Sequence, residues 1–146
     1  MFVIQMGKCM TDVQRWLIDS KVLKVLSATH PEIVEEAQRA IVPAMNDLIM
    51  IKEIYDFTCL SYQPQTDYQH KLLFIASILR LFNPDALIAE CKLRHGLRAS
   101  LAKCLGYSGQ STTYYINQAR AYMKIRTFKA SVAVMTEQYL HQIPSA

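Results

Sequence analysis

Basic side chains without acidic neighbours occupy one stretch of the sequence, residues 91–136. This stretch holds eight Lys or Arg residues and no Asp or Glu, whereas residues 1–90 have a net charge of −3. A field of one sign over such a length attracts polyanions, and nucleic acid is the commonest partner of this kind. A solvated basic face without a specific partner is the alternative. The eight residues are Lys92, Arg94, Arg98, Lys103, Arg120, Lys124, Arg126 and Lys129.

Sequence patterns for catalysis or metal binding are missing. There is no Gly-rich phosphate loop, H-E-x-x-H or G-x-S-x-G motif, and the four histidines are scattered. The four cysteines form no C-x-x-C pair, and we expect them to be reduced and buried. The sequence therefore predicts a protein that is not an enzyme and that has no metal site and no cofactor.

The sequence also lacks the features of a membrane protein. No apolar run approaches the ~18 residues of a membrane-spanning helix. Residues 1–6 are briefly apolar but have no positively charged segment before them, as a secretory signal would. We expect a cytoplasmic protein, and translation from Met6 or Met10 remains an alternative to Met1.

Helix-start signals and one proline divide the N-terminal half. Thr11-Asp12 can cap a first helix, and Thr29 with Glu32 matches a capping box for a second helix with Ile33 on its inner side. Pro43 must break or kink that helix. An exposed aromatic patch within residues 11–60 is a candidate dimer seam. The apolar residues of the first helix recur at helical spacing at Val13, Trp16, Leu17, Leu23 and Leu26.

The middle of the chain predicts a buried helix and a short one. Thr66 or Asp67 can cap a helix that Asn83-Pro84 closes and that is apolar on much of its circumference, so we expect it at the centre of the core. Asn83 is expected to cap the following helix, which begins at Pro84. Gly96 suits the C-terminal cap of that short helix.

A specific pattern lies at residues 101–117. Ala102 is small where two crossed helices would approach, Gly106 permits the positive φ of a sharp turn, and Ser108 is a good N-cap. These residues predict one helix near residues 97–105 and a longer one from Gly109 to about Arg126. The inner side of the second helix is then Thr112, Tyr115, Ile116 and Ala119.

This pattern resembles the helix-turn-helix of bacterial and phage transcriptional regulators over about twenty residues. The resemblance implies that the second helix enters the major groove of DNA. Thr112 and Gly109 depart from it, because the family favours a branched apolar residue at the first position and no helical glycine at the second. The implied base-reading residues are Ser108, Gln110, Thr113, Tyr114 and Asn117. The implied phosphate contacts are Arg94, Arg98, Lys103, Arg120 and Lys124.

The expected architecture is an all-α protein. Residues 1–82 form an acidic helical scaffold, which can dimerise through its N-terminal helices, and residues 83–146 form a basic trihelical helix-turn-helix region with a C-terminal helix. The leading hypothesis is a small prokaryotic or phage transcriptional regulator that binds double-stranded DNA. An all-α protein–protein interaction or assembly module with a purely architectural helix-turn-helix is the alternative, followed by sequence-independent RNA or single-strand binding.

Overall fold

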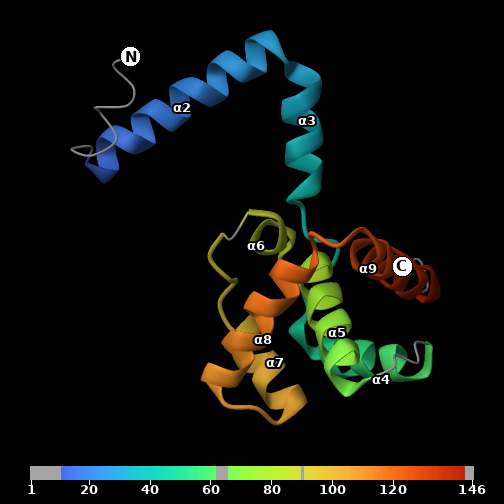
Figure 1. The fold of residues 1–146 in the computed structure, drawn as a ribbon. Helices are drawn as coiled ribbons and strands as arrows, with labels where there is room; N and C mark the ends of the chain where they lie inside the picture. The colour runs from blue at the N-terminus through green and yellow to red at the C-terminus, as the bar shows by residue number, and fades with distance from the viewer. Residues whose placement is uncertain (1–10, 62–65, 90, 144–146) are drawn as a thin grey trace. The chain divides into compact units, whose positions relative to one another are not determined.

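Helices make up the regular structure of the chain. The computed structural model describes residues 11–61, 66–89 and 91–143, and these ranges contain no strand. The predicted all-α class is confirmed. The alternative starts at Met6 and Met10, and most of the loop predicted after Ser61, lie outside the described residues. The chain divides into two compact units, residues 1–40 and residues 41–146, which are described separately (Figure 1).

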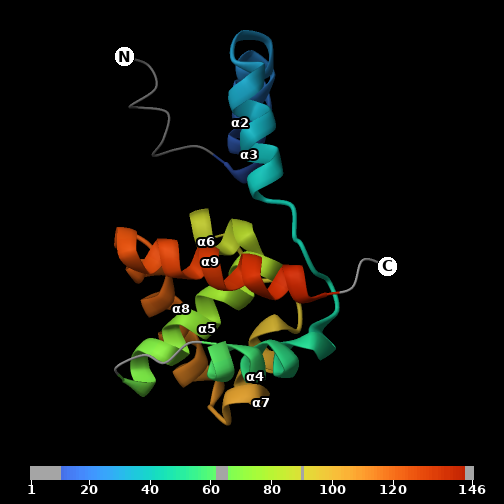
Figure 2. The same ribbon diagram turned by 90° about the vertical axis from the view of Figure 1, so that its right-hand side faces the viewer.

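The first unit contains α2 (Asp12–Thr29) and α3 (Pro31–Ala40), which meet at an angle in Figure 1 and overlap in the view of Figure 2. Thr11 caps α2 as predicted. Its hydroxyl accepts from the Gln14 amide at 3.2 Å, and the Gln14 side-chain oxygen accepts from the Thr11 amide at 3.0 Å. Two of the amides that a helix start leaves without partners are thereby satisfied.

The predicted capping box at Thr29 and Glu32 is wrong. Thr29 is the last residue of α2, and its hydroxyl donates to the Val25 carbonyl oxygen at 2.8 Å. Because Thr29 continues the first helix, it cannot take the non-helical conformation of an N-cap for the second. The turn lies instead at His30, and Ile33, expected on the inner side of α3, is 52% exposed.

The second unit is built around one buried helix, α5 (Asp67–Phe82), which contacts α4, α6, α8 and α9. Every residue from Leu72 to Leu79 is buried, as the apolar circumference of this helix predicts. Thr66 caps it by accepting from the Gln69 amide at 3.2 Å. The surrounding elements are η1 (Leu48–Met50), α4 (Ile51–Ser61), α6 (Pro84–Ala89), α7 (Leu97–Leu105), α8 (Gly109–Tyr122) and α9 (Arg126–Gln142).

The packing of α5 explains where the two units divide. The core is continuous across residue 82, because α4 and α5 share it with α8 and α9. The two compact units divide after Ala40, where α3 has ended before Pro43 as predicted.

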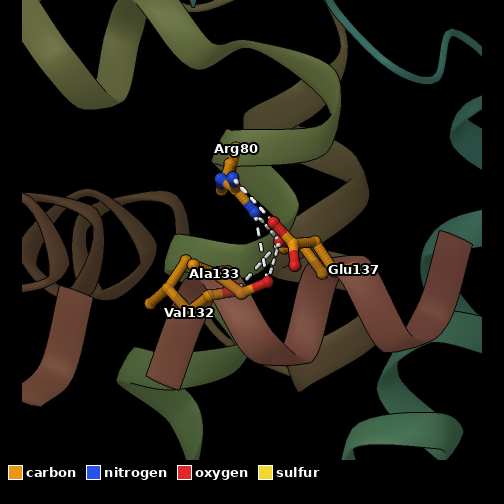
Figure 3. Close-up of polar contacts among 5 residues, drawn as sticks. Arg80, Val132, Ala133 and Glu137 are labelled. Carbon is orange, nitrogen blue, oxygen red and sulfur yellow. Dashed lines mark hydrogen bonds and ion pairs between the residues drawn. The ribbon is translucent and has the colours of Figure 1, made fainter. Parts of the chain in front are cut away.

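The side chain of Arg80 on α5 contacts α9 through hydrogen bonds and an ion pair (Figure 3). Its Nη1 donates to the Ala133 carbonyl oxygen at 3.3 Å and to the Thr136 hydroxyl, and its Nη2 lies 3.9 Å from a Glu137 carboxylate oxygen. The contacts with Ala133 and Thr136 are partly buried, whereas Glu137 is largely exposed. This arginine therefore stabilises the position of α9 chiefly through hydrogen bonds rather than through its ion pair.

Three local expectations are corrected around α6 and α8. Asn83 ends α5, and its side-chain oxygen accepts from the Arg94 amide at 2.6 Å instead of capping α6. Gly96 has the positive φ (+84°) of a left-handed residue, but it precedes α7, because the helix before it has already ended at Ala89. The helix from Gly109 ends at Tyr122, and α9 is separate from it.

Candidate nucleic-acid interface

The turn between α7 and α8 has the conformation that the sequence predicts. Gly106 has φ +71°, a left-handed conformation that costs a non-glycine residue about 1–2 kcal/mol. The amides of Gly106 and Tyr107 both donate to the carbonyl oxygen of Ala102. This arrangement ends α7 abruptly and leaves three residues, Gly106, Tyr107 and Ser108, between α7 and α8.

Ser108 caps α8, and Thr112 is accommodated in the core. The Ser108 hydroxyl accepts from the Ser111 amide at 3.1 Å, as predicted. Thr112 is fully buried, and its hydroxyl donates to the Ser108 carbonyl oxygen at 2.8 Å. The threonine thus occupies an apolar position without leaving its polar group unsatisfied. A side chain at Gly109 would meet open space.

Five polar residues form a stripe along α8 and the turn that follows it, with a spacing of three, four, three and four residues. We call it the α8 stripe: Gln110, Thr113, Asn117, Arg120 and Lys124. Thr113, Asn117 and Arg120 each directly follow a buried position (Thr112, Ile116 and Ala119), so the stripe lies beside the buried side of the helix. Gln110, Asn117 and Lys124 are exposed, while Thr113 and Arg120 are half-buried. Three hydrogen-bonding uncharged side chains therefore precede two cations on one side of the helix.

The basic end of the α8 stripe opens into a pocket of about 380 Å³. We call it the basic pocket, and it lies among α6, the end of α8 and the start of α9. Three of its lining residues are cations and none is acidic, so the pocket has a positive potential that suits an anion. Its lining is Leu87, Ile88, Asn117, Arg120, Ala121, Met123, Lys124 and Lys129.

Arg120 is held in place at the edge of this pocket. Its Nε donates to the Ala86 carbonyl oxygen at 2.7 Å, and its Nη1 donates to the Asn117 side-chain oxygen at 3.2 Å. A guanidinium has five N–H donors, so three remain for a ligand. Arg120 was predicted to contact a phosphate and Asn117 to contact a base, and a hydrogen bond joins the two side chains.

The other three predicted phosphate contacts lie outside the basic pocket. Arg94 is half-buried, and its Nη2 donates to the Asn46 carbonyl oxygen, so this cation holds two loops of the second unit together. Lys103 lines a separate pocket of about 500 Å³ beside η1 and α4, together with Lys52. Arg98 is exposed in the first turn of α7. The structure thus brings together Arg120 and Lys124, but not all five predicted phosphate contacts.

Aromatic contacts position Tyr114 at the edge of the α8 stripe. Tyr107 stacks on Tyr115 with ring centroids 5.1 Å apart, and Tyr114 meets the same ring edge-on at 5.4 Å. Tyr114 remains 53% exposed. Its ring is supported from one side and accessible from the other.

Sequence reasoning missed two cations near these elements. Lys129 belongs to α9 and reaches the basic pocket because the chain turns between Tyr122 and Arg126. Its place in the acid-free segment was the only available signal. Lys71 of α5 lies 5.0 Å from the centre of the Tyr107 ring, and a hydrogen bond to Tyr107 raises the pKa of this lysine. Lys71 therefore stays charged beside the turn.

The described residues offer little for other chemistry. They contain no group of three His, Cys, Asp or Glu side chains that could hold a metal ion, and no helix among them has the length and apolarity needed to cross a membrane. Cys59, Cys91 and Cys104 carry free thiols, but the first two are exposed rather than buried as expected. Comparisons of the chain with known protein families, with curated proteins and with solved structures found no match.

Proposed function

We propose that this protein binds double-stranded DNA as a prokaryotic or phage transcriptional regulator, with α8 in the major groove. The observation that carries the proposal is the continuity of the α8 stripe with the basic pocket. Uncharged hydrogen-bonding side chains occupy the N-terminal half of the stripe, and cations without acidic neighbours occupy its C-terminal end. Such an order suits a helix that reads base edges with its first turns and contacts phosphates with its last.

The base-reading half consists of Gln110, Thr113 and Asn117, with Tyr114 and Ser108 beside them. Glutamine and asparagine can each form two hydrogen bonds with the major-groove edge of adenine, and the threonine methyl suits the methyl group of thymine. The Asn117 oxygen already accepts from Arg120, which fixes its orientation and leaves its NH₂ group free to donate. Gln110 is exposed and is the stronger candidate for direct base contact.

The phosphate-binding half consists of Arg120, Lys124 and Lys129 around the basic pocket. Arg98, exposed at the start of α7, extends this set. Lys103 and Arg94, which the resemblance also implied, have other surroundings, and we assign them no phosphate. We propose that α6, α7 and α8 act as the trihelical DNA-binding unit, in which α7 packs on α8 and Arg120 bonds α8 to the Ala86 carbonyl oxygen of α6.

Selection of bound duplexes from a randomised pool tests this function. If the protein is a regulator, the selection should enrich a defined sequence. The purified protein should then bind that sequence more tightly than a scrambled one. Gln110→Ala should reduce this preference by about 1–3 kcal/mol per lost base contact, while Lys129→Gln should weaken both duplexes equally. Enrichment of no sequence, together with equal effects of the two substitutions, would mean that α8 does not read bases.

One observation favours the alternative, an assembly module with an architectural helix-turn-helix. Arg94 and Arg120 each donate to a backbone carbonyl oxygen of the second unit, a typical role of structural arginines. In that case the basic pocket is a solvated surface, and no duplex binds even at low salt. Lys124 and Lys129 have no such internal role among the described contacts, which is why we favour DNA.

A further inference from the structure

The apolar side chains of α2 are exposed to solvent. No residue of this helix is buried, although it carries seven exposed large apolar residues. Helices in proteins owe most of their stability to the packing of an apolar face rather than to helix propensity. A covering surface for α2 is therefore expected. The exposed residues are Val13, Trp16, Leu17, Val22, Leu23, Val25 and Leu26, with Trp16 at 66%.

One side of α2 has the spacing of a coiled-coil seam. Val13, Trp16, Ser20, Leu23 and Ser27 follow one another at three, four, three and four residues, the spacing of core positions in a heptad repeat. Leu17 and Leu26 lie at the edges of this seam and widen its apolar part. The two serines are small, and they keep the seam weaker than one of leucines throughout.

The charges beside the seam indicate what covers it. Asp19 directly precedes the central seam residue Ser20, and Lys24 directly follows Leu23 on the opposite edge. In a parallel pair of identical helices, the first of these positions lies opposite the second of the other copy. Two symmetric Asp19–Lys24 pairs then form. In an antiparallel pair, Asp19 would lie beside Asp19 of the other copy and Lys24 beside Lys24, and these like charges would repel each other.

We infer that a second copy of this chain covers this side of α2, as a parallel two-helix pair that buries Trp16. The inference is independent of DNA binding, because it uses only the first unit. The seam is short, so the pair is a reversible dimer whose population depends on protein concentration.

Trp16 is the only tryptophan of the chain and reports directly on this seam. Sedimentation velocity and fluorescence emission are measured on the full chain over a dilution series. We expect the mass to rise from monomer to dimer with concentration, and the emission to shift to shorter wavelength over the same range. A monomer at every concentration contradicts the inference. A monomer with concentration-independent, short-wavelength emission would show instead that the chain's own second unit covers α2.

Charge variants test the register. Asp19→Lys or Lys24→Asp alone should raise the dimer dissociation constant by roughly three- to tenfold, because two ion pairs become two repulsions. The double variant should restore the original value. Lys21→Asp is the matched control, since it reverses the same charge on the same helix but away from the seam. Equal weakening by the control, or no restoration in the double variant, overturns the parallel register.

Discussion

The Nε of Arg120 donates a hydrogen bond of 2.7 Å to the carbonyl oxygen of Ala86, and this bond joins the α8 stripe to α6. The accepting carbonyl lies among the last four residues of a short helix, where carbonyl groups have no partner within the helix. One side chain thus satisfies a helix end and points its remaining donors at the basic pocket. The geometry of the proposed phosphate site therefore depends on the packing of two helices.

Arg120→Lys should separate geometry from charge. Lysine keeps the positive charge but lacks the planar guanidinium group, which donates to the Ala86 carbonyl oxygen and to the Asn117 side-chain oxygen at the same time. We expect the free energy of unfolding to fall by about 1 kcal/mol and DNA affinity to fall although the net charge is unchanged. Lys124→Arg is the control at an exposed stripe position, with an expected change in stability below about 0.5 kcal/mol. Urea unfolding measures the stability and duplex titration measures the DNA affinity. If the two variants have the same stability and the same affinity, Arg120 does not position the site.

The two glycines of the turn should respond in opposite directions to alanine. Gly106→Ala places an alanine in a left-handed backbone conformation and should lower the free energy of unfolding by about 1–2 kcal/mol. Gly109→Ala meets open space at the start of α8 and should gain about 0.4–1 kcal/mol by restricting the unfolded chain. Chemical denaturation of both variants checks the pair. Stabilisation by Gly106→Ala would mean that the turn differs from the one described.

Arg80 and Glu137 should contribute unequally to stability. Arg80→Ala removes the hydrogen bonds to α9 and should lower the free energy of unfolding by about 1–2 kcal/mol. Glu137→Gln removes only an exposed partner 3.9 Å away and should change it by less than about 0.5 kcal/mol. Thermal unfolding of the two single variants tests this prediction. The prediction is wrong if Glu137→Gln is less stable than Arg80→Ala.

His70 should make stability depend on pH. Burial lowers the pKa of His70 from its usual 6.5, and its Nε2 is buried without a hydrogen-bond partner among the described residues. The unfolded chain therefore takes up this proton at a higher pH than the folded chain, so stability should fall as pH decreases below 6.5. His70→Gln should flatten this part of the profile. Unfolding curves measured from about pH 7 to pH 5 test the difference, and parallel profiles would exclude His70 as the cause.

The elements that the sequence predicted well are those fixed by local chemistry. Thr11, Thr66 and Ser108 cap helices because short polar side chains reach nearby amides. Gly106 adopts the predicted left-handed turn, and the apolar residues of α5 are buried on all sides. Thr29 shows the limit of such reasoning, because its hydroxyl can bond either an amide ahead or a carbonyl oxygen four residues behind.

Long-range contacts explain most of what the sequence did not predict. Arg94 bonds a carbonyl oxygen 48 positions away, and Arg120 bonds one 34 positions away, so neither role can be inferred from local spacing. Lys129 enters the basic pocket because α8 ends at Tyr122 and the chain turns before α9. The stripe itself was predictable from helical periodicity, whereas the pocket at its end required the fold.

Duplex DNA binding as a function of salt tests the central claim most directly. If Arg120, Lys124 and Lys129 contact phosphates, the logarithm of the affinity should fall linearly with the logarithm of salt concentration, with a slope of about −0.9 for each contact. Lys129→Gln should make this slope shallower by about 0.9, while Lys103→Gln, which removes the same charge from the other pocket, should leave it unchanged. Failure to bind any duplex at low salt, or equal slope changes in both variants, would contradict the proposed interface.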